Sequence, residues 1–187
     1  KPIGNVIVDI GGGTTEVAVI SLNGVVTKKA IKVAGDVMDH DIQNWFRNNH
    51  RLEIGDRTAE QIKIAVGSAM RSRSKNILVK GRDLVSGIPK TIDVRSDEIR
   101  QALKDSVKRI LEVVKDALES TPPELSSDII DRGILVAGGG AQLRGLDQVI
   151  REKTNVPCNV VEEPHLAIVK GCGKIIEDLE KYKHVLI

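Results

Sequence analysis

Three short segments near the start of the chain are rich in apolar and β-branched residues. They are Ile3–Ile10, Glu16–Ile20 and Val25–Val33, and their Val and Ile content favours β-strands. Asn23-Gly24, between the second and third segments, is a strong signal for a hairpin turn. Because short turns join neighbouring antiparallel strands, the pattern predicts an antiparallel meander.

Helical spacing of apolar residues replaces the strand pattern after this meander. A helix is expected to begin at Gly35-Asp36, with an apolar face made of Met38, Ile42, Trp45 and Phe46. Thr58 and Gln61 have the spacing of a capping box, which predicts the start of a second helix. The buried stripe expected on that helix comprises Ile62, Ala65, Val66 and Ala69.

Basic and polar residues dominate the next stretch, from Arg71 to Val94. Short strands are expected at Ile77–Val79 and Thr91–Val94, on either side of Gly87-Ile88-Pro89, so the stretch reads as a small β insertion. A long helix capped by Ser96 is expected after it, ending before Pro122-Pro123. A short helix then leads to Gly133, which suits a helix C-cap.

The last part of the chain alternates between strands and helices. Strands are expected at Ile134–Ala137 and Cys158–Val161, and helices at Ala141–Lys153 and Leu166–Tyr182. Such alternation is typical of βαβ units, so the whole sequence predicts an α/β fold with meander strands and helix-linked parallel strands in one mixed sheet. Residues 1–50 and 96–187 would form the core, and residues 51–95 a small inserted α+β lobe.

Composition narrows the class of protein. The 187 residues include 41% hydrophobic and 29% charged residues but only three aromatic ones, which predicts a globular chain with an aliphatic core. A net charge of +2 gives no argument for nucleic-acid binding. Cys158 and Cys172 lack CxxC spacing, so we expect two small buried hydrophobes in a reducing compartment. The chain lacks an initiator Met, and Lys1-Pro2 leads almost directly into a strand, as expected of a piece of something longer.

Two glycine triplets are the strongest chemical signals. Gly11-Gly12-Gly13 lies between two expected strands, and Gly138-Gly139-Gly140 lies between a strand and an expected helix. The sequence contains no GxxxxGK[ST] motif, which excludes a P-loop. A Rossmann fingerprint is also disfavoured, because a strand follows the first triplet and Leu143 stands where the second would need Gly or Ala.

Phosphate binding remains consistent with these triplets. Glycines allow backbone amides to approach an anion closely, and Thr14 and Thr15 add hydroxyl donors. Asp9, at the end of the first strand, is placed to hold Mg²⁺ directly or through water. A helix N-terminus after Gly138–Gly140 would also favour an anion. Taken alone, the first triplet could equally serve a tight turn, and for the second a plain strand-to-helix turn is the better interpretation.

Other polar clusters have simpler interpretations. Asp36, Asp39, His40 and Asp41 could hold a metal, but acidic residues in a first helical turn are the better interpretation. The remaining histidines show no zinc spacing, and no Ser-His-Asp or Cys-His set can be argued. The basic stretch that includes Arg71, Arg73 and Lys75 could touch acidic lipid or a neighbouring subunit, although a solvated surface is the simpler explanation.

The sequence resembles the C-terminal half of the MreB family of bacterial actins over nearly its whole length. The resemblance rests on "VIVDIGGGTTEVAVISLNGVV", "GDRTAEQIKIAVGSA", "VKGRDLVSGIPKTI", "TPPELSSDIIDRGILVAGGGAQLRGLDQVI" and the final helix. It implies one half of an actin-like ATPase. In the superfamily of actin, sugar kinases and heat-shock chaperones, two RNase-H-like halves clamp a nucleotide between them. The other half would be absent here.

The resemblance also implies roles for individual residues. Gly11–Thr15 would be the second phosphate loop, with Thr14 positioning the attacking water and Asp9 holding Mg²⁺ through water. The family segment that contacts the adenosine corresponds to Glu60, Gln61, Ile62 and Lys63. From the residues alone, a solvated surface ion pair is the simpler interpretation of Glu60 and Lys63. The family loop that lies against the adenine and ribose corresponds to Gly138, Gly139, Gly140 and Ala141.

The implied function is a cytoplasmic, filament-forming ATPase that maintains cell shape. Its cofactors would be ATP and Mg²⁺, and its partners further copies of itself and cell-wall synthesis and division or elongation proteins at the membrane. The resemblance implies that the family's first phosphate loop, its water-orienting glutamate and its membrane-inserting elements would lie outside this chain, so the chain alone is expected to be inactive. "MRSRSKN" and Cys172 depart from the family pattern and indicate a divergent member. A stand-alone assembly module without turnover, or another ATPase of the superfamily, remains an alternative.

Overall fold

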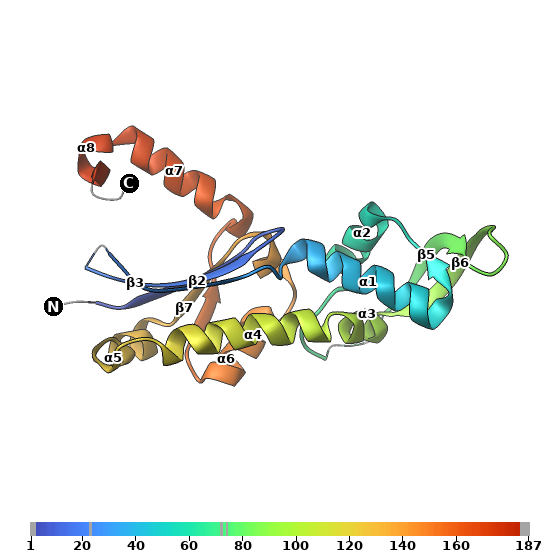
Figure 1. Ribbon diagram of the computed structural model, residues 1–187, viewed down its shortest axis with the longest axis horizontal. Coiled ribbons are helices and arrows are strands. Elements are labelled where there is room, and N and C mark those ends of the chain that lie inside the picture. Colours follow the sequence, from blue (N-terminus) through green and yellow to red (C-terminus); the bar gives the residue numbers. More distant parts are fainter. Residues whose placement is uncertain (1–2, 23, 72, 74, 184–187) are drawn as a thin grey trace.

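The computed structural model describes residues 3–22, 24–71, 73 and 75–183 (Figure 1). Within this part, the first three strands form the predicted meander: β1 (Asn5–Ile10), β2 (Thr15–Ser21) and β3 (Gly24–Ile31) pair antiparallel in sequence. β7 (Ile134–Ala137) pairs parallel to β1, and β8 (Cys158–Val160) pairs parallel to β7. The strand order β3-β2-β1-β7-β8 confirms the mixed sheet, whereas Asn23 of the predicted turn lies outside the described residues.

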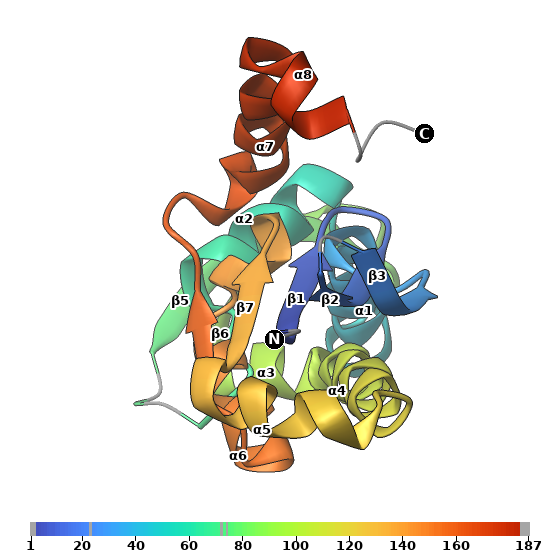
Figure 2. The same cartoon turned by 90° about the vertical axis from the view of Figure 1, so that its left-hand side faces the viewer.

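Helices cover one face of this sheet. Figures 1 and 2 show α4 (Lys104–Glu119), α5 (Pro123–Arg132) and α6 (Leu146–Thr154) together below the strands. Because these helices cover one face, burial alternates along β1: Val6, Val8 and Ile10 are fully buried, and the residues between them are only half-buried. The buried core is aliphatic, as the composition predicts, with Phe46 its one large aromatic side chain among the described residues.

A second, smaller sheet stands at the far end of helix α1 (Gly35–His50). Its strand order is β4-β5-β6, and the strands cover Leu52–Glu53, Asn76–Asp83 and Pro89–Arg95. The predicted insertion strands are therefore confirmed but longer, whereas β4 was not anticipated. Two residues are too few to produce an alternation that a sequence pattern can reveal. Helices α2 (Asp56–Val66) and α3 (Ser96–Ala102) lie beside this sheet (Figure 1).

Several helix starts predicted from caps are wrong. α2 begins at Asp56 with Gly55 as N-cap, so Thr58 lies inside the helix, and Ala65 of the predicted stripe is exposed. Ser96 does not cap a long helix: its hydroxyl accepts from the Lys75 amide at 3.0 Å, and the helix breaks at Leu103 into α3 and α4. The Ser96 hydroxyl thus forms a tertiary contact instead of a local cap, which a local motif cannot reveal.

The predicted start of the helix after the second glycine triplet is also wrong. A short 3₁₀ turn, η1 (Gly139–Gln142), follows the triplet, and α6 begins only after Gly145, which has φ +73°. The final predicted helix is likewise divided: η2 (Pro164–Leu166) precedes α7 (Ala167–Glu177), and α8 (Leu179–Tyr182) follows.

Helix α7 projects from the sheet without packing on the core. Figures 1 and 2 show it standing on the side of the sheet opposite α4–α6. Its apolar side chains are open to solvent, with Ile168 and Val169 each 61% and Ile176 70% exposed. Cys172, on the same helix, is exposed, which corrects the prediction that both cysteines are buried. Cys158 is buried as predicted, and burial followed by the nearby Asp147 carboxylate raises the pKa of its thiol to about 11.

No helix in the described ranges is long and apolar enough to cross a membrane.

Candidate functional site

The two glycine triplets meet at one edge of the large sheet. β1 and β7 run parallel, with Asp9 opposite Ala137, and each strand is followed directly by a triplet. Because parallel strands end at the same edge, segments about 125 residues apart come side by side, a placement typical of ligand sites in α/β sheets.

Hydrogen bonds to helix α1 hold the first triplet. The Gly11 amide donates to the Thr14 carbonyl at 3.0 Å and closes the turn. At the start of α1, the Gly35 amide donates to the Gly11 carbonyl at 3.1 Å, and the Asp36 amide donates to the Gly12 carbonyl at 2.9 Å. Within the described residues, the amides of Gly12 and Gly13 donate to no other group, so they remain available to an anion.

Tight packing against β1 shapes the second triplet. Gly138 has φ +85°, and its amide donates to the Pro164 carbonyl at 2.8 Å. A Cβ there would lie 2.3 Å from the Ile10 carbonyl oxygen, and one at Gly140 would lie 2.4 Å from an Ile10 side-chain carbon. By contrast, a Cβ on Gly139 would meet no atom within 4 Å. Two of these glycines are therefore required by packing, and the third faces open space.

A cavity of about 410 Å³ lies between the triplets and helix α2. Six of the residues proposed from the sequence line it: Gly11, Gly12, Glu60, Lys63, Gly139 and Gly140. Glu60 and Lys63 lie one turn apart on α2 and face the cavity, as expected for residues off the apolar stripe. The structure thus brings three separate sequence signals to one concave surface of the size that small ligands occupy.

Lys63 forms a largely buried ion pair rather than a surface pair with Glu60. Its ammonium lies 2.7 Å from Asp39 Oδ2 and donates to the Gly35 carbonyl at 3.0 Å. The Lys63 and Asp39 side chains are 16% and 17% exposed. Burial raises the pKa of Asp39; the hydrogen bond and charge of Lys63 oppose this rise, while Glu60 and Asp36 add to it.

Asp9 lies behind the triplets rather than in the cavity wall. Its Oδ1 is buried and has no hydrogen-bond partner within the described part of the chain. Burial, and secondarily the charge of Glu16, raises the pKa of Asp9. An orphaned carboxylate oxygen beside a phosphate-type loop fits a role in holding Mg²⁺, which favours one or two carboxylates plus phosphate oxygens.

The other residues proposed from the sequence do not line the cavity. Thr14 and Gly13 are exposed, as is Gln61. Thr15 is fully buried, and its hydroxyl donates to the Val33 carbonyl at 2.6 Å. The side chains of Ile62 and Ala141 belong to the hydrophobic core, and Gly138 is buried behind the cavity. Contacts of these residues with a ligand stay predictions.

Several lining residues were not proposed for this site from the sequence. They are Gly35, Asp36, Met38, Asp39, Ile64, Gly67, Gln142, Leu143 and Arg144. Asp36 and Asp39 stood out only as an acidic cluster, and no group of three metal-ligating side chains exists in the described ranges. Arg144 donates to the Ala65 carbonyl at 2.8 Å and so joins the loop after the second triplet to α2. No local signal could have linked these positions, because the contacts span the whole chain.

Comparison with known proteins identifies the family of this chain. A family model described as MreB/Mbl protein matches residues 1–184. The chain belongs to the MreB/Mbl family. The cell shape-determining protein Mbl of Bacillus subtilis is 48% identical over 182 residues, which cover 97% of this chain and 55% of Mbl. The cell shape-determining protein MreB of Escherichia coli is 45% identical over 180 residues, covering 96% of this chain and 52% of that protein.

Solved structures of relatives have the same fold. MreB5 of Spiroplasma citri bound to AMPPNP superposes with a TM-score of 0.92 at 36% identity, covering 98% of this chain and 55% of MreB5. A double helical filament of MamK gives a TM-score of 0.72 at 26% identity, covering 86% of this chain and 50% of MamK. The α/β fold is therefore the actin-like one, and the chain spans about half the length of the curated relatives it matches.

Proposed function

We propose that this chain is the nucleotide-binding half of an actin-like ATPase that forms filaments and maintains bacterial cell shape. The observation that carries the proposal is the single cavity lined by both glycine triplets and by Glu60 and Lys63 of α2. The structures of MreB5 bound to AMPPNP and to ADP support a nucleotide as its ligand. The name "cell shape-determining protein", shared by Mbl and MreB, supports the cellular role.

Each part of the site has a proposed task toward ATP and Mg²⁺. The free amides of Gly12 and Gly13 bind phosphate oxygens, and Asp9 holds Mg²⁺, which would neutralise phosphate charge when bound. The exposed Thr14 hydroxyl positions the attacking water. Glu60 and Lys63 contact the nucleoside from one side, and Gly139 and Gly140 contact it from the other.

The cleft would be completed by a second half. We propose that residues 1–50 and 96–187 form the core subdomain of one actin half and residues 51–95 its inserted lobe. The apolar side chains of α7, exposed here, would pack against the other half, since large exposed apolar surfaces usually mark contacts. The two halves together would supply the opposing phosphate loop that hydrolysis needs.

The test compares this chain alone with the same chain preceded by the N-terminal half of a relative. The chain alone should bind Mg-ATP weakly in calorimetry and show no hydrolysis above buffer, whereas the joined protein should hydrolyse ATP. Thiol labelling of the exposed Cys172 should slow in the joined protein, because α7 becomes covered. Robust turnover by the 187-residue chain, or unchanged labelling, would contradict the proposal.

Filament formation is proposed to use the tip of the small lobe. The Asp83 carboxylate orders this tip, since its Oδ1 accepts from the amides of Val85 at 2.8 Å and Ser86 at 3.0 Å. Hydrogen bonds, first from Lys90 and then from these amides, lower the pKa of Asp83. The ordered turn presents Val85 and Ile88, which are 83% and 62% exposed. The MamK filament supports self-association as the use of such a surface.

Ile88→Asp in the joined protein is therefore expected to reduce sedimentation of nucleotide-induced filaments several-fold, because it places a charge in an apolar contact. Pelleting by ultracentrifugation measures the effect, and Leu78→Asp, which alters another exposed apolar side chain of the same lobe (73% against 62% exposed), is the matched control. Normal pelleting of the Ile88 variant, with loss in the Leu78 variant, would place the contact elsewhere.

The alternative function is a stand-alone assembly module without nucleotide turnover, favoured if the lobe surface supports assembly while ATP does not bind. The intact protein is proposed to act in the cytoplasm, associated with the membrane and with cell-wall synthesis and division or elongation proteins. Nucleic acid is not among the proposed partners.

A further inference from the structure

Gly35 lies at the junction between the two sides of the cavity. Its amide donates to the Gly11 carbonyl of the first triplet, and its carbonyl accepts from the Lys63 ammonium of α2. A Cβ at this position would lie 3.4 Å from the Gly11 oxygen and 3.4 Å from Lys63 Nζ. One residue of α1 therefore connects the phosphate side of the cavity to the nucleoside side.

Asp39 determines where the Lys63 ammonium lies. The carboxylate is one turn beyond Gly35 on α1, and its Oδ2 lies 2.7 Å from Lys63 Nζ. Asp39 and the Gly35 carbonyl occupy two of the three donors of the ammonium, so one donor remains for the cavity that Lys63 lines. Because both charges are mostly buried, removing one would leave the other without compensation.

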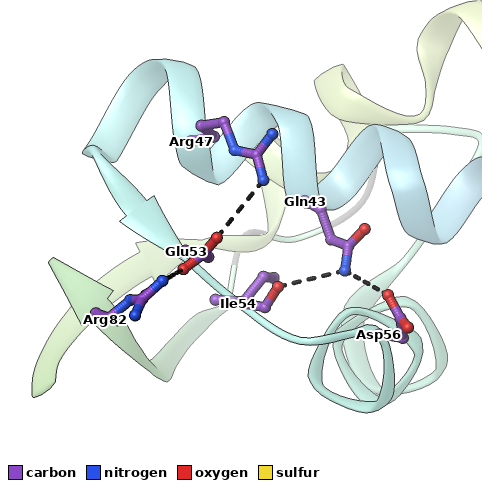
Figure 3. Close-up of polar contacts among 6 residues, drawn as sticks. All are labelled: Gln43, Arg47, Glu53, Ile54, Asp56 and Arg82. Carbon is purple, nitrogen blue, oxygen red and sulfur yellow. Dashed lines mark hydrogen bonds and ion pairs between the residues drawn. The ribbon is translucent and has the colours of Figure 1, made fainter. Parts of the chain in front are cut away.

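A second polar contact joins the same two helices. Gln43 lies one turn after Asp39 on α1, and its amide donates to Asp56 Oδ1 at 2.7 Å and to the Ile54 carbonyl at 3.3 Å (Figure 3). Asp56 is the first residue of α2. Asp39 and Gln43 thus form one polar edge of α1, which fixes α2 at its start and two turns further along.

We propose that Asp39 is a positioning residue of this site. Through Lys63 it holds α2 against the first turn of α1, and it thereby couples the nucleoside side of the cavity to the first glycine triplet. A ligand that orders one side then reduces the entropic cost of ordering the other, which gives positive cooperativity between them. The coupling between ligands rests on the proposed nucleotide site, whereas the effect of Asp39 on the triplet does not.

The first test therefore needs no ligand. Asp39→Asn is expected to shift the amide ¹⁵N–¹H resonances of Gly11, Gly12 and Gly35 and to accelerate the hydrogen exchange of the Gly11 and Gly35 amides, which are hydrogen-bonded. Asp39→Glu, which keeps the charge, should restore part of the exchange protection. Glu112→Gln, which breaks the exposed 3.6 Å pair with Lys108 on α4, is the matched control and should leave these resonances unchanged. Unchanged triplet resonances in Asp39→Asn would overturn the proposal.

The second test measures the coupling itself by calorimetry. In the parent chain, saturation with inorganic tripolyphosphate is expected to tighten adenosine binding about fivefold, the lower end of typical coupling between sites. In Asp39→Asn, the factor by which tripolyphosphate tightens adenosine binding should fall to one. A preserved factor would overturn the proposal. Failure of the parent chain to bind ATP, adenosine or tripolyphosphate would instead overturn the proposed function, while the resonance test still decides on Asp39.

If Asp39→Asn does not fold, the double variant Asp39→Asn/Lys63→Met replaces it, because it leaves no buried charge unpaired. The double variant should fold and show the same loss of triplet protection; a double variant with the parent's protection would overturn the proposal.

Discussion

Gly138→Ala is expected to lower the free energy of unfolding by about 3 kcal/mol or more. The backbone at φ +85° and ψ 164° lies in a region that is nearly exclusive to glycine, and it costs an alanine about 1–3 kcal/mol. The new Cβ would also lie 2.3 Å from the Ile10 carbonyl and 2.6 Å from Asp9 Oδ1, an overlap that adds about 1–3 kcal/mol. Thermal unfolding followed by circular dichroism should show a midpoint roughly 6–12 °C lower.

Gly139→Ala is the matched control for this loss of stability. A Cβ there meets no atom within 4 Å, so the midpoint should stay within the small range typical of surface substitutions. Because Gly139 lines the cavity, its added methyl group should nevertheless weaken nucleotide binding. Equal midpoints for the two variants would show that the second triplet is not held against β1 as described.

Asp9→Asn is expected to stabilise the ligand-free chain and to abolish the effect of Mg²⁺ on nucleotide binding. The buried Oδ1 belongs to a carboxylate and has no partner in the described part of the chain, and an uncompensated buried charge costs about 1 kcal/mol or more beyond a neutral amide at the same place. Neutralising it should raise the unfolding midpoint by about 2–4 °C at neutral pH. Calorimetry with ATP, with and without Mg²⁺, should show Mg²⁺-dependent tightening in the parent only.

The stabilisation by Asp9→Asn should depend on pH in a defined direction. The pKa of Asp9 is raised in the folded chain, so the folded state binds the proton more tightly than the unfolded state. The aspartate therefore costs no stability below its unfolded pKa of about 4, and its cost grows as pH rises through the folded pKa. The difference in midpoint between variant and parent should shrink as the pH falls toward 4. A difference that widens in acid would contradict this account.

Much of the large sheet could be predicted because its signals are local. The Val- and Ile-rich segments of β1, β2 and β3 and the strand Ile134–Ala137 agree with the structure to within two residues. The helix starts were less accurate: the Ser96 hydroxyl accepts from the distant Lys75 amide, and α2 begins at Asp56, two residues before the predicted cap Thr58. A capping motif describes neighbours in sequence and contains no information about such partners.

The sequence by itself determined the glycine triplets, the aspartate before the first of them and a mixed sheet of meander and helix-linked strands. These features follow from residue type and local patterns. The position of β7 beside β1, which brings the triplets together, was decided by the tertiary structure. The tertiary structure alone decided which side chains share the cavity. It paired Lys63 with Asp39, 24 positions away, rather than with Glu60, and placed the Thr15 hydroxyl in the core. The reason is physical: burial and ion pairing depend on how helices α1 and α2 pack, and packing is a property of the whole chain.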